Sequence, residues 1–164
     1  MGLVGREGAG PHDLLQMARR GRILDWAGES QYYVEPKRLA KLGYLEPRPE
    51  PGRTRPRTVY SLTEQGRDAL REWAATPVTV TPLKSEPLLR LLIADLVGED
   101  VTREALATLR EDLADLNQRL DASEAAAETL PHRAPYLLAA NRFLRRFVDL
   151  HAELVDEVER ELRG

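Results

Sequence analysis

Cysteine is absent from the 164-residue sequence, which excludes disulfides, thiolate-bound metals and a cysteine nucleophile. The three histidines, His12, His132 and His151, lie far apart along the chain, without the spacing of metal ligands. The sequence also lacks a Gly-rich phosphate loop, a nucleophilic serine elbow and a pattern of paired carboxylates. We therefore expect no metal, no cofactor and no enzymatic activity.

Long apolar runs are missing as well. The longest apolar stretch, residues 88–97, is interrupted by Arg90 and Asp95 and is too short to span a bilayer. The N-terminus lacks the basic and then apolar pattern of a secretory signal. The sequence therefore predicts a cytoplasmic protein without a membrane partner.

Charge is distributed unevenly along the chain, although the formal net charge is only −3. Residues 1–73 carry 13 basic and 10 acidic residues, whereas residues 74–164 carry 11 basic and 17 acidic residues. Residues 36–57 alone hold seven basic residues against two acidic ones. A basic module joined to an acidic one is compatible with nucleic acid binding, because a polyanion is bound by a local patch and not by the net charge.

The N-terminal half shows the element order of a winged helix-turn-helix domain, which we expect over residues 1–75. Helices are predicted from Pro11 to about residue 20, as a short helix or turn over residues 22–27, and from a cap at Ser30 to a stop at Gly43. Residues 44–46 and 58–62 alternate like strands, and the Pro-, Gly- and Arg-rich residues 47–57 join them as a long hairpin loop, the wing. Thr63 caps a further helix that extends to about residue 75.

The C-terminal half is predicted to be helical. Residues 76–87 contain three prolines and little periodicity, so they are expected to form a linker. Residues 88–164 contain three segments with apolar residues at helical spacing, and residues 132–135 separate the last two. The predicted fold is mainly α with a small β-hairpin wing: a winged helix-turn-helix domain followed by a C-terminal helical dimerisation domain.

Basic residues concentrate on the predicted third helix and on the wing. A helix fits the major groove of B-DNA, where base edges differ, and an arginine-rich hairpin beside it reaches phosphates or the minor groove. Alternate spacing would place the three wing arginines on one side of an extended loop. The candidate DNA-binding residues are Gln31, Tyr32, Tyr33, Lys37, Arg38, Lys41, Arg53, Arg55 and Arg57.

Two other interpretations of these residues stay open. A solvated loop is often rich in arginine for solubility alone. Tyr32 and Tyr33 are nearly as well suited to the domain core, because residues 32 and 36 fall on the same helix face as Leu39.

Two motifs on this half point to a family. The first consists of Tyr33, Leu39, Gly43, Tyr44 and Leu45, and the second follows the pattern Tyr-x-Leu-Thr-x-x-Gly-Arg at Tyr60, Leu62, Thr63, Gly66 and Arg67. Together they resemble the PadR family of transcriptional regulators, and residues 84–97 look like the start of the Vir-type helical domain of many PadR proteins. The resemblance covers most of the chain. The second motif by itself also occurs in other winged-helix repressors, including MarR-like regulators.

The resemblance implies a transcriptional regulator, usually a repressor, that acts as a homodimer on double-stranded DNA with a two-fold symmetric operator. It also implies a response to a small aromatic effector. The alternative functions are a winged-helix adaptor that binds protein and not DNA, or a MarR-like regulator. The salt dependence of duplex binding separates the two, because only phosphate contacts make affinity fall steeply with ionic strength.

The last predicted helix carries two neighbouring apolar rows, more than one partner helix would cover, and an identical subunit is the usual cover. The expected dimer interface is Leu137, Asn141, Leu144, Val148, His151, Val155 and Val158, and the second row is Ala140, Phe143, Phe147, Leu150 and Leu154. The polar members, Asn141 and His151, either fix the register of the seam or, for His151, sense pH.

Four aromatic side chains are the candidate lining of an effector pocket: Trp26, Trp73, Phe143 and Phe147. Aromatic residues at helical spacing more often belong to a hydrophobic core, and this alternative stays open for each of them.

Overall fold

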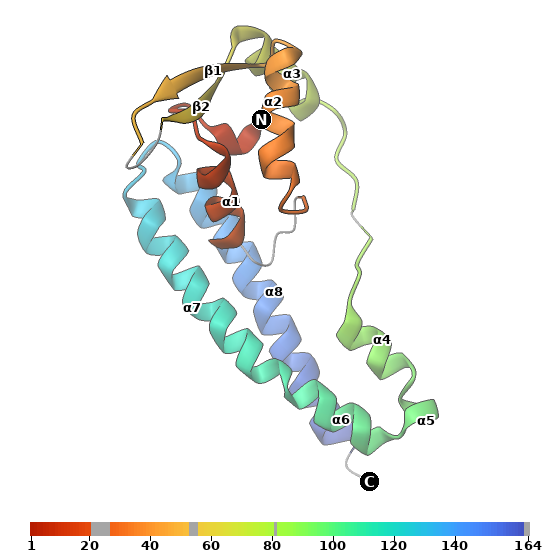
Figure 1. Cartoon of the computed structure of the whole chain (residues 1–164). Coiled ribbons are helices and arrows are strands. Elements are labelled where there is room, and N and C mark those ends of the chain that lie inside the picture. Colours follow the sequence, from red (N-terminus) through yellow and green to blue (C-terminus); the bar gives the residue numbers. More distant parts are fainter. Residues whose placement is uncertain (21–26, 53–55, 81, 163–164) are drawn as a thin grey trace. The chain divides into compact units, whose positions relative to one another are not determined.

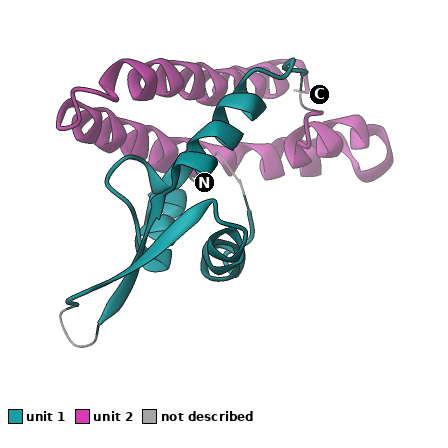
Figure 2. Ribbon diagram, turned by 90° about the horizontal axis from the view of Figure 1, so that it is seen from above, with its two compact units in different colours: residues 1–80 teal, residues 81–164 magenta. Residues whose placement is uncertain are grey.

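The computed structural model describes residues 1–20, 27–52, 56–80 and 82–162. The chain divides into two compact units, unit 1 (Met1–Val80) and unit 2 (Thr81–Gly164), which Figure 2 shows in teal and magenta. Unit 1 combines helices with one two-stranded antiparallel hairpin, and the described part of unit 2 contains helices and connecting segments. The predicted fold class, mainly α with a small β-hairpin, is confirmed.

Unit 1 begins with a short 3-10 helix, η1 (Gly2–Val4), followed by α1 (Pro11–Arg20), α2 (Gln31–Lys41), β1 (Leu45–Glu50), β2 (Arg57–Leu62) and α3 (Glu64–Ala74) (Figure 1). Pro11 starts α1 as predicted, because proline at a first helical position loses no intrahelical hydrogen bond. The predicted short helix over residues 22–27 falls almost entirely outside the described residues.

Gly43 stops helix α2, whose last residue is Lys41, as the sequence predicts. Gly43 has a φ of 81°, its amide donates to the Ala40 carbonyl at 3.0 Å, and the Tyr44 amide donates to the Leu39 carbonyl at 3.0 Å. These are the two hydrogen bonds of a Schellman motif, which requires a left-handed residue at this position. At the other end of α2, Ser30 occupies the N-cap position without a side-chain capping bond. Pro36 lies inside the helix.

The hairpin differs from the sequence prediction, because β1 continues through Pro47 and Pro49 to Glu50 and the wing loop is correspondingly shorter. Pro47 pairs with Tyr60 in the register of the hairpin. The Tyr60 backbone exchanges two hydrogen bonds with Ala9, at 3.0 and 3.1 Å, and therefore points away from β1. Proline is tolerated opposite such a residue, because the missing amide hydrogen removes no ladder bond.

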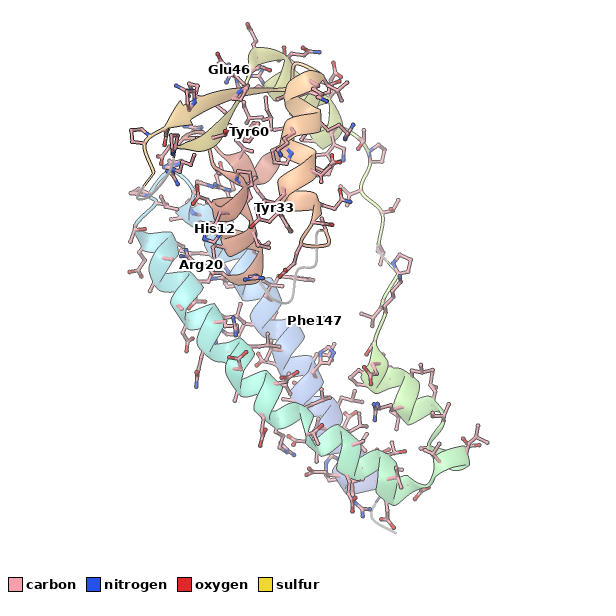
Figure 3. The ribbon with its side chains drawn as sticks, in the orientation of Figure 1. His12, Arg20, Tyr33, Glu46, Tyr60 and Phe147 are labelled. Carbon is pink, nitrogen blue, oxygen red and sulfur yellow. The ribbon has the colours of Figure 1, made fainter. Side chains whose placement is uncertain are left out.

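The core of unit 1 lies between the hairpin and the helices. Its buried residues come from every element except α3: Val4, Ala9, Leu14, Leu15, Tyr32, Leu45 and Tyr60 (Tyr60 is labelled in Figure 3). The contacts of Tyr60 with Ala9 therefore attach β2 to the segment before α1, while Leu45 anchors β1 in the same core.

The Tyr-x-Leu-Thr-x-x-Gly-Arg motif joins the hairpin to α3. The Thr63 hydroxyl accepts a hydrogen bond from the Gly66 amide at 3.0 Å and donates one to the Gly43 carbonyl at 2.6 Å. Gly66 is buried against the backbone of Tyr44, and Arg67 donates to the Leu62 carbonyl at 2.9 Å. The motif that carries the family resemblance is thus a structural junction between α2, β2 and α3.

Unit 2 contains α4 (Glu86–Leu92), α5 (Ala94–Val97), α6 (Glu99–Ala107), α7 (Leu109–Glu128) and α8 (Ala134–Glu161). The sequence predicted three helical segments here, and each of the first two forms two helices. The first segment is divided into α4 and α5 at Ile93, and Gly98, with a φ of 102°, separates it from the second. Between α6 and α7 the Thr108 hydroxyl donates to the Ala105 carbonyl at 2.7 Å, a bond that competes with the backbone ladder.

Helices α7 and α8 lie side by side and run in opposite directions (Figure 1). Leu113, Leu120 and Ala127 of α7 are buried in unit 2, as are Leu144 and Val148 of α8. Arg145 of α8 bonds Asp121 at 2.8 Å, and Arg110 of α7 bonds Asp156 at 2.7 Å. Within the described residues, no helix has both the length and the apolar character that a membrane span requires.

Replacing Gly66 with alanine should destabilise unit 1. A Cβ at this position would lie 2.1 Å from the Tyr44 carbonyl oxygen, so the backbone must move, and overpacking of this kind costs about 1–3 kcal/mol. The higher helix propensity of alanine offsets less than about 1 kcal/mol of this cost. Urea unfolding followed by tryptophan fluorescence measures the effect, because both tryptophans, Trp26 and Trp73, belong to unit 1.

Gly28→Ala is the matched control, since a Cβ there meets no atom within 4 Å. Equal unfolding midpoints for the two variants would contradict the close approach of α3 to Tyr44.

Candidate nucleic-acid interface

Helix α2 presents one polar, basic face to solvent. A helix turns by about 100° per residue, so Gln31, Tyr33, Val34, Lys37, Arg38 and Lys41 share one half of its circumference. All six are exposed, whereas Tyr32 and Pro36 on the opposite half are buried. The outward face of α2, defined by these six residues, therefore carries three cations and two groups that form hydrogen bonds.

The structure separates the two neighbouring tyrosines that the sequence left undecided. Tyr32 is 8% exposed and belongs to the core of unit 1, so its ring is covered by the domain itself. Tyr33, which Figure 3 labels, is 44% exposed and lies on the outward face of α2. Of the two candidate contacts only Tyr33 is accessible to a partner.

Arg38 is engaged by an acidic neighbour on its own helix. Its guanidinium donates to both carboxylate oxygens of Glu35, with the shortest bond, from Nη2 to Oε2, at 2.8 Å. This hydrogen bonding lowers the pKa of Glu35 from its usual value, so the carboxylate is ionised at neutral pH. Arg38 must leave Glu35, at least in part, before it can bind a phosphate.

Arg57 is held at the base of the wing. Its Nη1 lies 3.0 Å from Asp13 Oδ2 on α1, and its Nη2 lies 3.3 Å from Glu50 Oε2, directly across the hairpin. Asp13 also accepts a hydrogen bond from the Gly10 amide at 3.0 Å. Arg57 thus links both strands of the hairpin to α1, and two carboxylates offset its charge. The other two predicted wing arginines, Arg53 and Arg55, lie outside the described residues.

Arg48 is an exposed wing cation that the sequence analysis did not select. It lies on β1, and its Nη2 donates to the Ser61 hydroxyl at 2.6 Å. Residues 47–50 were predicted as loop, in which the direction of the Arg48 side chain is not fixed. In the structure these residues belong to a strand, which fixes that direction. Its signal was the alternation of Glu46, Arg48 and Glu50, which is the period of a strand.

The row of α8 expected to contact a second subunit is mostly covered within the chain. Asn141, Leu144, Val148, Val155 and Val158 are buried inside unit 2, and Leu137 and His151 are half-buried. The covering elements are α6 and α7. The second row is the more accessible one: Phe143 is 67% and Leu150 is 59% exposed. An identical subunit would therefore meet the second row, because that row is the accessible one. Periodicity predicted both apolar rows but does not show which of them the chain itself covers.

The two polar members of the covered row have partners within unit 2. The Ser123 hydroxyl lies 3.3 Å from Asn141 Oδ1, while Asn141 Nδ2 is buried without a hydrogen-bond partner. His151 Nδ1 lies 2.8 Å from the Phe147 carbonyl oxygen, and its ring is 4.5 Å from the Phe147 ring (Phe147 is labelled in Figure 3). Asn141 therefore belongs to the α7 and α8 contact.

The four aromatic residues considered for an effector pocket do not share one unit. Trp73 lines an apolar pocket of unit 1, whereas Phe143 and Phe147 lie on α8 of unit 2. Trp26 lies outside the described residues. In the described ranges, no group of three or more His, Asp or Glu side chains has the geometry of a metal site.

The chain matches no protein-family model and no curated protein. Solved structures resemble it over nearly its whole length. Bacillus subtilis PadR in complex with operator DNA has a TM-score of 0.67 at 20% identity, over 96% of this chain and 95% of that chain. The PadR-like transcriptional regulator BC1756 of Bacillus cereus has a TM-score of 0.73 at 16% identity, over 98% and 90%. The virulence activator AphA of Vibrio cholerae has a TM-score of 0.69 at 23% identity, over 94% and 90%.

These similarities extend across both units, and they agree with the motifs at Tyr33–Leu45 and Tyr60–Arg67 in the sequence. The chain has the fold of the PadR-like transcriptional regulators, a winged-helix unit followed by a helical unit.

Proposed function

We propose that this chain is a sequence-specific DNA-binding transcriptional regulator in which α2 enters the major groove. The observation that carries the proposal is the outward face of α2, where Lys37, Arg38 and Lys41 are exposed together with Gln31 and Tyr33. Lysine and arginine bind phosphates, and the amide and phenol groups can donate to or accept from base edges. A structural neighbour, Bacillus subtilis PadR, was solved with operator DNA, which supports the same role for this fold here.

The wing supplements α2 in this proposal. Arg48 on β1, together with Arg53 and Arg55, which follow β1 in the sequence, would contact the phosphate backbone or the minor groove beside the groove that α2 occupies. Arg57 has a different role, because its contacts with Asp13 and Glu50 fix the angle of the hairpin on α1.

A homodimer is the expected active form, on an operator with two-fold symmetry. Exposed apolar side chains on α8, namely Tyr136, Phe143 and Leu150, lie at spacings of seven residues and so form one stripe. Apolar residues are also exposed on α4 and α5 of the same unit: Leu88, Leu89, Leu92, Leu96 and Val97. A second copy of unit 2 would cover such surfaces.

Repression is the direction of regulation that we propose, because a dimer bound to an operator excludes other proteins from the DNA that it covers.

We also propose that a small aromatic effector binds the protein and relieves this repression. The described aromatic candidates for this effector are Trp73 of unit 1 and Phe143 and Phe147 of unit 2.

Duplex binding should weaken steeply with salt, and cations on α2 should contribute to that dependence. Each phosphate that is neutralised contributes a slope of about −0.9 in log affinity against log salt. Lys37→Ala and Lys41→Ala should each make the slope shallower by up to about 0.9, whereas Lys84→Ala, a lysine of unit 2, should leave it unchanged. Fluorescence anisotropy with a genomic fragment selected by the protein measures both quantities. Absence of duplex affinity even at low salt would support the protein-binding adaptor instead.

Arg57→Ala should behave differently from the α2 lysine variants. Because Arg57 orients the wing and is already paired with two carboxylates, its loss should lower affinity for all duplexes without changing the salt slope. The same anisotropy titrations provide the measurement, with Arg48→Ala as the matched wing variant. A slope reduced by about 0.9 in Arg57→Ala would show that Arg57 contacts phosphate directly, and its positioning role would then be rejected.

Aspartate at Phe143 or Leu150 should convert the dimer into monomers. A buried, unpaired carboxylate is strongly unfavourable in an interface core. Sedimentation equilibrium of the full chain gives the dimer dissociation constant, which should rise by at least about 100-fold, or roughly 3 kcal/mol. Arg142→Asp, on another side of α8, is the control and should remain dimeric. Dimers of unchanged affinity in both Phe143→Asp and Leu150→Asp would place the interface elsewhere.

A further inference from the structure

Unit 1 contains an apolar pocket of about 660 Å³, a volume within the usual range of small-molecule sites. Leu14 of α1, Leu39 of α2 and Leu45 of β1 form part of its wall. Leu70 and Trp73 of α3 form another part, and η1 closes it further. The pocket therefore lies on the side of α2 that faces into unit 1, and it reaches Gln31 at the edge of the outward face proposed to bind DNA.

Two polar side chains of α2 line this pocket. Gln31 and Glu35 are four residues apart and so lie one above the other on the helix. Glu35 is the only acidic residue among the residues that line the pocket in the described part of the chain, and no lysine or arginine lines it there. The aromatic rings of Tyr32 and Trp73 are also part of the wall. A carboxylate together with aromatic rings is the chemistry that recognises an organic cation.

We propose that this pocket binds an apolar organic molecule that carries one ammonium group. The apolar body lies against the leucines and Trp73, and the ammonium lies beside the Glu35 carboxylate, whose side chain is 37% exposed. Charge complementarity selects the cation, because an anionic molecule of the same shape is repelled by Glu35 and a neutral one forms no ion pair with it.

Two cationic groups already face Glu35. Arg38 bonds both of its carboxylate oxygens, and the amino group of Met1 is close enough for an electrostatic interaction. Burial lowers the pKa of that amino group, which weakens it as a permanent partner. The pair of Glu35 with Arg38 is exposed to solvent, and exposed pairs contribute little, so a bound ammonium can replace Arg38.

The site couples to the outward face of α2 through Arg38, and this consequence rests on the proposed DNA-binding function. When Arg38 binds a phosphate it leaves Glu35 without its partner. A ligand ammonium replaces that partner, so ligand and DNA each favour binding of the other, by the same factor. The ligand should therefore raise duplex affinity, by roughly two- to five-fold given the small contribution of an exposed pair. A ligand in this pocket would therefore strengthen repression, and the aromatic effector that relieves repression would bind at another site.

A set of three probes of similar shape tests the site on the full chain without DNA: naphthylmethylammonium, naphthylmethanol and naphthoate. Isothermal titration calorimetry should give the ammonium compound an affinity about two- to five-fold higher than that of the alcohol, because the pair with Glu35 is partly exposed, and the naphthoate should bind most weakly. Equal affinities for the three probes, or no binding of the ammonium compound up to its solubility limit, would overturn the proposal.

Two isosteric variants locate the contact. Glu35→Gln should remove the preference for the ammonium compound and leave the affinity of naphthylmethanol unchanged. Glu72→Gln, an exposed position on α3 that does not line this pocket, should retain the preference. A preference that persists in Glu35→Gln would overturn the assignment of the cation to Glu35.

Titration of a duplex with and without the ammonium probe separates this proposal from the DNA-binding one. If the probe binds but the protein has no duplex affinity, the ligand site is supported and the DNA-binding function is rejected. Duplex binding that the probe does not strengthen, despite probe saturation, would reject the coupling through Arg38.

Discussion

Thr63 joins the three elements on which the candidate DNA face depends. Its hydroxyl bonds the end of α2 at the Gly43 carbonyl and the start of α3 at the Gly66 amide, and its own amide donates to Tyr44 at 3.2 Å. The close approach of Gly66 to Tyr44 leaves no room for a side chain. Because the end of α2, the end of the hairpin and the start of α3 meet at one residue, the outward face of α2 and the wing are held in a fixed relation within unit 1.

Some of the positive side chains on α2 and the hairpin form ion pairs within unit 1 and are not free to bind a partner. Arg57 is committed to Asp13 and Glu50, and Arg38 is paired with Glu35. A count of basic residues therefore overstates the attraction that a phosphate backbone would experience. Arg38 differs from Arg57 in one respect: its partner, Glu35, lies on its own helix and lines a pocket. In the proposed coupling, the availability of Arg38 depends on what occupies that pocket. The same residue thus connects the inner and outer faces of α2.

Local chemistry made much of the fold predictable from the sequence. Pro11, Gly43 and Thr63 begin or end elements through hydrogen bonds to residues close by in the chain, so their patterns are visible locally. The extent of β1 was not predictable, because Pro47 is tolerated only in a register that turns the backbone of its partner Tyr60 away from β1, toward Ala9, and that register is not visible locally. Periodicity showed two apolar rows on α8, but only the packing of α6 and α7 shows which row is covered. The partner of Arg57, Asp13, is likewise 44 residues away.

The most direct test of the central claim, that the outward face of α2 binds duplex DNA, is the mapping of NMR chemical-shift changes on the full chain. On addition of an operator duplex, the largest changes should fall on Gln31, Tyr33, Lys37 and Lys41 and on the wing. The exposed acidic residues of α3, which are Glu64, Asp68 and Glu72, should remain unaffected. Changes confined to unit 2 or to α3, with α2 unperturbed, would contradict the account.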